Sequence, residues 1–296
     1  IALHPTPRVP YVIDLCPDAW EALAPLADGC TAEEFIDNDV RDFLIPWWNW
    51  HELGSDWSGP DTPTSPARVI GYGSYEQFVD EIKRAADQCD KYFLVRIYGS
   101  HFEKAYFSRG IENFLADMAG DPPFARRLLQ GIIDRNMVMI ENIIGLPEID
   151  GILLGSDWGS QMGLLMAPDV WQEMIRPGEQ REYDLIHAWG KDVWIHSCGN
   201  IEPIIPSLIE MGVQVLNPVQ PEAMDLARLK RSYGEKLTFW GGISTQQTLP
   251  YGTPDQVRAE ARAVRELMAE GGGYVFSPAQ SIQGDVPVEN MLALLE

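Results

Sequence analysis

The chain has 296 residues, 45% of them hydrophobic, and its 22 Lys and Arg face 44 Asp and Glu, which gives a formal net charge of −22 at pH 7. This charge repels nucleic-acid phosphates and anionic lipid head groups, so we exclude nucleic acid as a partner. The sequence has no apolar run near the roughly 20 residues of a membrane span, no signal-peptide pattern and no disulfide-type cysteine spacing. We therefore expect a cytoplasmic globular protein without a membrane partner, and, because the sequence opens on Ile1, some residues before it.

Short β-rich runs alternate with segments of helical character along the chain. The eight predicted strands span residues 9–15, 42–48, 91–98, 151–155, 192–196, 213–217, 237–241 and 273–277. Helix signals lie between them: one helix starts at Ser74, a long one runs from Asp121 to Ile144, and Thr253 opens a capping box with Gln256. Alternation of this kind predicts a single-domain (β/α)8 barrel of α/β class over residues 1–296. A doubly wound open sheet is the alternative, but its glycine-rich phosphate turn is missing after the first strand.

In barrels of this kind the active site is assembled after the carboxyl ends of the strands, so polar residues there are the candidates. The long irregular stretch at residues 49–73 follows the second strand, and we expect it to be either a binding loop or a plain capping loop. The candidate set comprises Asn49, His51, Glu52, Arg96, Tyr98, His101, Glu103, Asp157, Gln161, His196, Cys198, Asn200, Asn217, Gln220, Ser244, Gln280 and Gln283.

His196 and Cys198 stand out within this set, because side chains two apart on an extended segment point the same way. An imidazole beside a thiol offers half of a zinc site, or a nucleophile with its base. Taken alone, the pair is equally compatible with a buried thiol and a histidine that bonds to a backbone carbonyl.

Asp157 follows the fourth predicted strand, and we expect its carboxylate in a barrel mouth partly walled by Trp158 and Trp240. Partial desolvation there would suit a general acid or base, whereas a nearby cation would keep the carboxylate ionised. A carboxylate that caps the following turn is the alternative.

Several motifs together resemble the uroporphyrinogen decarboxylase superfamily, which includes the decarboxylase of haem biosynthesis and zinc-dependent, corrinoid-linked methyltransferases. The resemblance runs from about Val9 to the C-terminus and implies a (β/α)8 barrel. The motifs are GSDWGSQ at 155–161, PDVW at 168–171, HSCGN at 196–200, LNPVQ at 216–220, FWGGI at 239–243 and SPAQSI at 277–282.

The two branches of this superfamily differ in ways that bear on the chain. In the methyltransferase branch a His-x-Cys pair and a further Cys hold zinc. His196 and Cys198 match the pair, but Gln280 stands at the further position, and a neutral amide is a poor zinc ligand. The decarboxylase branch has a histidine there and an arginine-rich N-terminal motif for substrate carboxylates. Here Arg8 is the N-terminal arginine, and Arg96 and Arg109 are the others we expect near the mouth, too few for a substrate with eight carboxylates.

Three functions remain open from the sequence. The first is methyl transfer between a corrinoid on a separate protein and a thiol or related small acceptor, with Zn²⁺ on His196 and Cys198. The second is a metal-independent decarboxylase. In it Asp157 stabilises a protonated, electron-rich ring or donates a proton, while Tyr106 and Gln280 position the substrate. The third is a non-catalytic barrel that binds a small molecule.

The site residues that we predict fall into two sets, and the resemblance adds a homodimer as the expected assembly. The catalytic set is Asp157, His196, Cys198, Gln280 and Tyr106, and the substrate-binding set is His51, Arg96, Glu103, Gln161, Asn217, Gln220 and Trp240.

Overall fold

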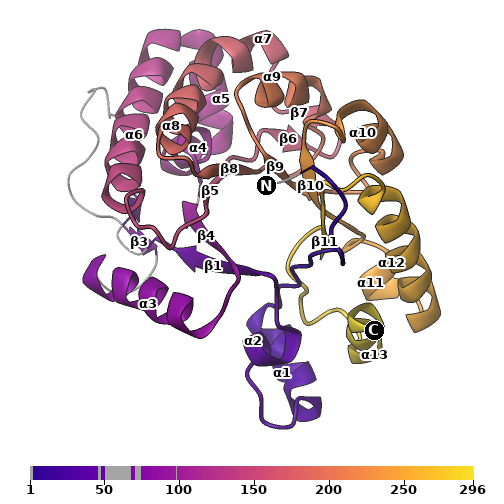
Figure 1. Cartoon of the computed structure of the whole chain (residues 1–296). Coiled ribbons are helices and arrows are strands. Elements are labelled where there is room, and N and C mark those ends of the chain that lie inside the picture. Colours follow the sequence, from indigo (N-terminus) through magenta and orange to yellow (C-terminus); the bar gives the residue numbers. More distant parts are fainter. Residues whose placement is uncertain (1–2, 46–47, 51–67, 71–74, 98) are drawn as a thin grey trace.

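The computed structural model describes residues 3–45, 48–50, 68–70, 75–97 and 99–296. Its strands surround a central axis and its helices lie outside them (Figure 1). Seven parallel strands form one sheet in the spatial order β1 (Val40–Leu44), β4 (Tyr92–Ile97), β5 (Gly151–Gly155), β8 (Asp192–His196), β9 (Val215–Val219), β10 (Thr238–Ile243) and β11 (Tyr274–Pro278). Two short antiparallel ribbons complete the strands, β2 (Trp48–Trp50) with β3 (Arg68–Ile70) and β6 (Gly159–Ser160) with β7 (Gly163–Leu164).

The eighth position of the barrel is taken by an extended segment, residues 9–16, where the sequence predicted a regular strand. Tyr11 and Leu15 form isolated parallel bridges to Phe276 and Ile282. On the other side, the Asp39 backbone N–H, just before β1, donates to the Tyr11 carbonyl at 3.1 Å. The segment thus closes the sheet between β11 and β1, and the fold is the predicted (β/α)8 barrel.

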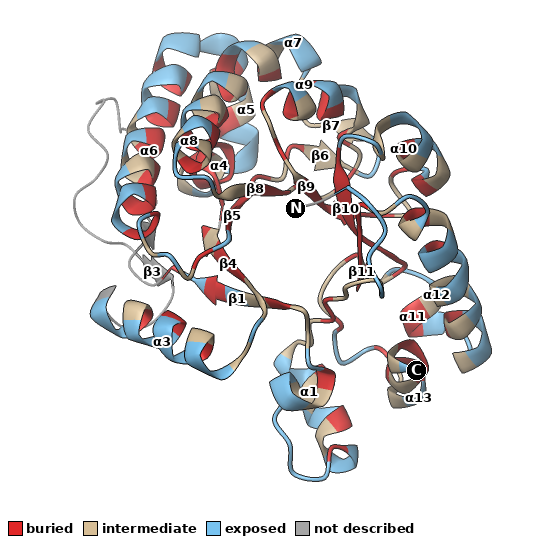
Figure 2. Cartoon of the chain, viewed as in Figure 1, coloured by how far each residue is buried: buried red, intermediate tan, exposed pale blue. Residues whose placement is uncertain are grey.

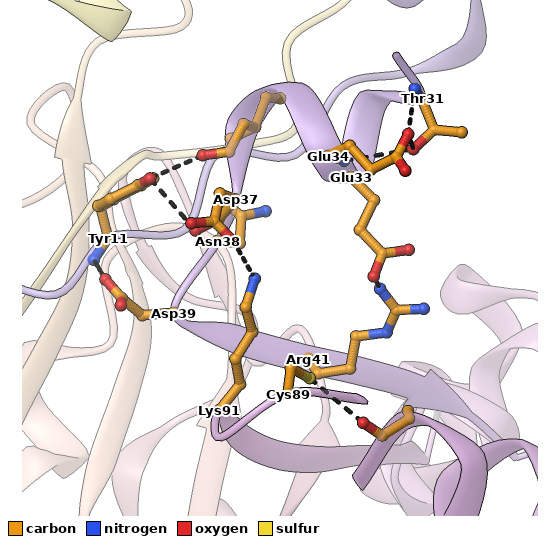
Figure 3. Close-up of polar contacts among 12 residues, drawn as sticks. Tyr11, Thr31, Glu33, Glu34, Asp37, Asn38, Asp39, Arg41, Cys89 and Lys91 are labelled. Atoms are coloured by element: carbon orange, nitrogen blue, oxygen red, sulfur yellow. Dashed lines mark hydrogen bonds and ion pairs between the residues drawn. The ribbon is translucent and has the colours of Figure 1, made fainter. Parts of the chain in front are cut away.

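Side chains hold this segment on its β1 side (Figure 3). The Asp39 carboxylate accepts a hydrogen bond from the Tyr11 N–H at 2.9 Å, and Asn38 Oδ1 accepts one from the Ile13 N–H at 2.8 Å. Pro10 has no N–H to offer to a ladder. Because side chains take up the backbone donors, the segment stays irregular.

The other predicted strands lie within a few residues of the observed ones. β9 begins two residues later than predicted and runs through Pro218, which follows a cis peptide bond. A proline interrupts the sequence pattern of a central strand, and this hid the end of β9. The second predicted strand is β1, at residues 40–44. Part of the stretch expected to be irregular forms the β2 and β3 ribbon, and His51 lies outside the described residues.

The helices cover the outside of the barrel with their buried faces toward the strands and their exposed faces outward (Figure 2). The long helix predicted after Asp121 is α6, which Asp121 caps, and Thr253 and Gln256 form the predicted capping box of α12. In the described part of the chain, no helix has the length and apolar character needed to cross a bilayer. The helices are α1 (Pro17–Leu23), α2 (Ala32–Ile36), α3 (Tyr75–Gln88), α4 (His101–Arg109), α5 (Ile111–Gly120), α6 (Pro122–Ile143), α7 (Pro168–Val170), α8 (Arg176–Ala188), α9 (Ile205–Glu210), α10 (Leu226–Tyr233), α11 (Thr248–Tyr251), α12 (Pro254–Ala269) and α13 (Val288–Leu295), with 3₁₀ turns at Ala24–Leu26 and Glu202–Ile204 and a π-helical turn at Trp171–Ile175.

The barrel interior changes from apolar to polar along its axis. One buried cluster takes one side chain from each of the eight positions: Val12, Val40, Leu94, Leu153, Trp194, Val215, Trp240 and Val275. Side chains two residues further along an extended chain point to the same side. The next layer, toward the carboxyl ends of the strands, therefore includes Asp14, Asp42, Arg96, His196, Asn217 and Ser277. We call this layer the polar floor of the mouth.

Candidate functional site

Two loops pack together at the mouth of the barrel, the β6 and β7 ribbon after β5 and the turn after β8. The Asn200 N–H donates to the Ser160 carbonyl at 2.8 Å, and the Trp158 N–H donates to Ser197 Oγ at 3.1 Å. Gly199 has a φ of +79°, and a Cβ there would lie 2.6 Å from the Ser160 carbonyl oxygen, so the close approach requires glycine. This packing brings the loop that carries Asp157 against the turn that carries Cys198.

Asp157, His196 and Cys198 direct one potential ligand atom each toward a common point, and these atoms lie within 4.8 Å of one another. His196 Nε2 is 3.4 Å from Cys198 Sγ and 3.8 Å from Asp157 Oδ1. All three residues are half-buried, which leaves the group accessible from the mouth. Nitrogen, sulfur and oxygen donors in one cluster suit zinc. The sequence analysis assigned Asp157 to catalysis, and the geometry adds it as a third candidate metal ligand.

Asn217 on β9 sets the tautomer of His196. Asn217 Oδ1 lies 2.6 Å from His196 Nδ1, and Asn217 Nδ2 faces the Trp240 carbonyl at 3.5 Å. Because the amide oxygen accepts, Nδ1 carries the proton and the Nε2 lone pair faces Cys198 and Asp157. Burial lowers the pKa of His196, which favours the neutral ring. A neutral imidazole with its second nitrogen held by a hydrogen bond is the form that ligates metals.

Cys198 is held by two further contacts. Its sulfur accepts a hydrogen bond from Gln280 Nε2 at 2.8 Å, and its backbone N–H donates to Asp157 Oδ1 at 2.8 Å. Burial, together with the negative charge of Asp157, raises the pKa of the Cys198 thiol to about 12. A divalent cation would reverse this effect, because a coordinating thiol is deprotonated. Gln280 thus contacts the predicted zinc ligand as a hydrogen-bond donor to sulfur.

Glu103 faces the same region from α4. It is 7% exposed and accepts a hydrogen bond from the Tyr106 hydroxyl at 3.2 Å. Burial, and then repulsion by Asp157, raises the pKa of Glu103 to about 7. Tyr106, predicted to position a substrate, therefore contacts Glu103 in this structure.

The structure leaves some predicted residues away from this cluster. Gln161 is exposed in the turn of the β6 and β7 ribbon. Gln220 is buried and accepts a hydrogen bond from the Gly199 N–H, so it supports the turn that carries Cys198.

Two tryptophans and one arginine correct our picture of the mouth. Trp158 and Trp240, expected to wall it, are 0% and 3% exposed and belong to the core, where large aromatic rings gain most from burial. Trp240 packs edge-on against Trp194 at 5.4 Å between ring centroids. Arg109 pairs with Asp117 of α5 at 2.9 Å, which holds it away from the mouth.

The sequence analysis missed two carboxylates of the polar floor, Asp14 and Asp42. Arg96, a predicted substrate-binding residue, forms an ion pair with Asp42 at 2.6 Å. The signal was present in the strand period, since Asp14 stands two residues after Val12 and Asp42 two after Val40. Neither aspartate lies in a recognisable motif, and both precede the strand ends on which we concentrated.

Comparison with known proteins agrees with this architecture. Residues 76–296 match the family described as uroporphyrinogen decarboxylase (URO-D). The chain belongs to the uroporphyrinogen decarboxylase family. A solved structure of a methyltransferase from Methanosarcina mazei covers 98% of this chain and 93% of its own, with a TM-score of 0.71 and 18% sequence identity, a likeness that shows the fold.

Both activities named in the sequence analysis recur among curated relatives of this URO-D family chain. Methylcobamide:CoM methyltransferase MtaA of Methanosarcina barkeri is 28% identical over 131 residues, which cover 44% of this chain and 36% of that protein. Uroporphyrinogen decarboxylase of Actinobacillus succinogenes is 24% identical over 182 residues, which cover 58% and 47%. Each match spans less than half of the relative's length.

Proposed function

We propose that this chain is a zinc-dependent methyltransferase that moves a methyl group between a corrinoid on a separate protein and a small thiol. The observation that carries the proposal is the cluster of Asp157, His196 and Cys198 at the barrel mouth. Membership of the URO-D family supports an enzyme, and the relative named as a methylcobamide:CoM methyltransferase supports this reaction class.

The residues present fit a zinc ion. One imidazole, one thiolate and one carboxylate would leave a fourth position of a tetrahedral site for the substrate. Zinc bound there would lower the pKa of an acceptor thiol and so make its sulfur nucleophilic at neutral pH. Asn217 keeps the proton of His196 on Nδ1, Gln280 donates a hydrogen bond to the Cys198 sulfur, and the Cys198 N–H holds the Asp157 carboxylate.

A methylated corrinoid would supply the methyl group to the acceptor sulfur after the thiol has lost its proton. The new sulfur–carbon bond would replace the carbon–cobalt bond, whose electron pair would stay with the cobalt. The sequence has no DxHxxG cobalamin-binding signature, so a partner protein would bring the corrinoid to the mouth.

A metal-independent decarboxylase is the second candidate, and one feature favours it. With a pKa of about 7, Glu103 is a carboxyl group that retains a proton near neutral pH and so could protonate a substrate carbon. Two contacts count against the form of this mechanism that the sequence suggested, since Asp157 is engaged by the Cys198 N–H and Tyr106 by Glu103.

Elemental analysis of the purified, untagged protein after mild dialysis tests the proposal. We expect about one zinc per chain, and thiol-dependent demethylation of free methylcobalamin by the zinc-loaded protein. Cys198→Ser should weaken zinc binding at least about 100-fold with little change in thermal stability. Cys30→Ser, which alters an exposed thiol, is the matched control and should keep its zinc. Absence of zinc after chelator-free purification, or unchanged zinc in Cys198→Ser, would contradict the proposal and favour the decarboxylase.

A further inference from the structure

The mouth carries more carboxylates than cations. Asp14 and Asp42 belong to the polar floor, and Glu103 and Asp157 follow neighbouring strands. Arg96 is the single Lys or Arg side chain that the described barrel strands direct inward, and it forms an ion pair with Asp42. Among the described residues, the Asp14 carboxylate has no hydrogen bond or ion pair, and Arg96 attracts it only at longer range.

The carboxylates of the floor are separated from the candidate zinc ligands by the order of the sheet. Asp14 lies on the closing segment and Asp42 on β1, whereas His196 lies on β8, three strands further around the barrel. The site therefore has two ends, with sulfur and nitrogen donors at one and a pair of aspartates at the other. Asp14 and Asp42 belong to neither group of three candidate metal donors found among the described residues.

Physical chemistry favours a positive charge at this second end. Asp42 lies deep in the barrel, but its side chain is still 30% exposed, so a solute that enters the mouth can reach it. Burial raises the pKa of Asp14 and of Asp42, and Arg96 offsets only part of this rise. A second positive charge beside the two carboxylates would further favour their ionised forms. A cleft lined by one sign of charge concentrates solutes of the opposite sign and repels those of the same sign.

We infer that the small-molecule acceptor is a thiol whose far end carries an ammonium group. Its sulfur would approach the cluster of Asp157, His196 and Cys198, while Asp14 and Asp42 would receive the ammonium group. The inference rests on the proposed function in one respect, since the reacting group is taken to be a thiol.

The test uses three series of ligands that differ only in the far end, namely ω-aminothiols, ω-mercaptoalcohols and ω-mercaptocarboxylates of two to six carbons. Each is titrated calorimetrically into metal-free protein, and spectroscopically into protein loaded with Co²⁺, whose visible and near-ultraviolet bands report a thiolate that joins the metal. We expect the best aminothiol to bind at least about tenfold more tightly than the carboxylate of equal length, with the alcohol between them. Added salt should narrow this difference.

Variants locate the charge preference. Asp42→Asn removes one negative charge and frees Arg96, so the preference for the aminothiol should fall at least about fivefold. Asp14→Asn should also reduce the preference for the aminothiol, while the ion pair between Arg96 and Asp42 stays in place. Asp87→Asn makes the same change on the exposed surface of α3 and should leave the preference unchanged.

The outcomes separate the inference from the proposed function. Carboxylate thiols that bind as tightly as aminothiols, or no binding of any aminothiol, would overturn the inference. A charge preference that persists in metal-free protein, while no thiol perturbs the Co²⁺ spectrum, would support a cationic ligand and contradict thiol activation.

Discussion

Two groups of three titratable side chains, each with ligand atoms within 4.8 Å of one another, occupy different parts of this barrel. Asp157, His196 and Cys198 are half-buried at the mouth. His101, Glu179 and Glu182 are fully buried between α4 and α8. The short distances between ligand atoms would by themselves suggest a metal site in both groups. The two groups differ, however, in how their charges are balanced.

The polar atoms of the buried group find hydrogen-bond partners within the group and among its neighbours. His101 Nε2 faces the Ile175 carbonyl at 3.1 Å and Nδ1 faces Glu179 Oε1 at 3.0 Å, so both ring nitrogens have polar partners. The Tyr183 hydroxyl donates to the other oxygen of Glu179 at 2.8 Å.

A buried ammonium completes the balance. Lys104 Nζ donates to Asn136 Oδ1 at 2.7 Å, and Asn136 Nδ2 donates to Glu182 at 2.6 Å. Lys104 offsets part of the negative charge of Glu179 and Glu182, although burial lowers the pKa of its ammonium group to about 7. No lysine contacts the mouth group among the described residues; the cation that acts on His196 is Arg96, which is itself paired with Asp42. Charge balance, more than the number of nearby ligand atoms, distinguishes the candidate metal site.

Replacement of the buried cation should produce the largest effect. Lys104→Met should lower the free energy of unfolding by about 3–5 kcal/mol, because it leaves buried carboxylates without their cation. Burial raises the pKa of Glu182 to about 7, so in the variant Glu182 can be neutral at pH 6. At pH 8 it must ionise without its cation, so the destabilisation should be greater at pH 8 than at pH 6. Urea denaturation at both pH values measures it.

The exposed residue Lys83 on α3 supplies the control for this experiment, since Lys83→Met should leave stability nearly unchanged. Zinc content should stay the same in both variants. A Lys104→Met protein that keeps its stability and loses its zinc would show that the buried group holds the metal.

Asp157→Asn should affect the mouth without affecting the fold. The amide oxygen of Asn can still accept the Cys198 N–H, but the negative charge is gone, so we expect zinc affinity to fall about 10- to 100-fold. Methyl transfer should fall with it, while the free energy of unfolding changes by less than about 1 kcal/mol. An aggregated or unfolded product would indicate that Asp157 mainly caps its turn.

Gln280→Glu should strengthen zinc binding, because it places a carboxylate where the amide stands. Because a carboxylate is a zinc ligand and a neutral amide is a poor one, the zinc dissociation constant should fall about tenfold in competition with a chelating dye. If zinc binds more weakly instead, the hydrogen bond from Gln280 to the Cys198 sulfur outweighs the added charge.

The smallest effect concerns the polar floor. Its position in the barrel raises the pKa of Asp42 to about 6, so the stability gained from its neutral form is present below the ordinary pKa of 3.8 and is lost as the pH rises through 6. Relative to Asp42→Asn, the native chain should therefore lose about 1 kcal/mol between pH 4.5 and pH 7.5, less than the pKa shift alone implies because the side chain is 30% exposed. A pH-independent difference would mean that Arg96 offsets the effect.

The sequence was informative wherever local periodicity decides the structure. Alternating strands and helices predicted the barrel, and the spacing of His196 and Cys198 placed both at the end of β8. The third donor depends on packing between loops about 40 residues apart, which Gly199 permits and which no local pattern reveals. The buried group joins side chains of α4, α6 and α8 without a motif, so its balance emerged only from the packed helices.

The closing segment gives this barrel a seam. Elsewhere neighbouring strands are joined by ladders, with one irregularity between β9 and β10. Residues 9–16 instead meet β11 and the region that follows it through isolated bridges at Tyr11 and Leu15. Local opening of the native barrel should concentrate there, because in the described residues the Asp39 N–H to Tyr11 carbonyl bond is the one backbone hydrogen bond on the β1 side. Amide exchange at Val12 should therefore be faster than in the ladder of β4 and β5. Asp14 lies on this seam. The acidic end of the mouth therefore belongs to the segment of the barrel that we expect to open most readily.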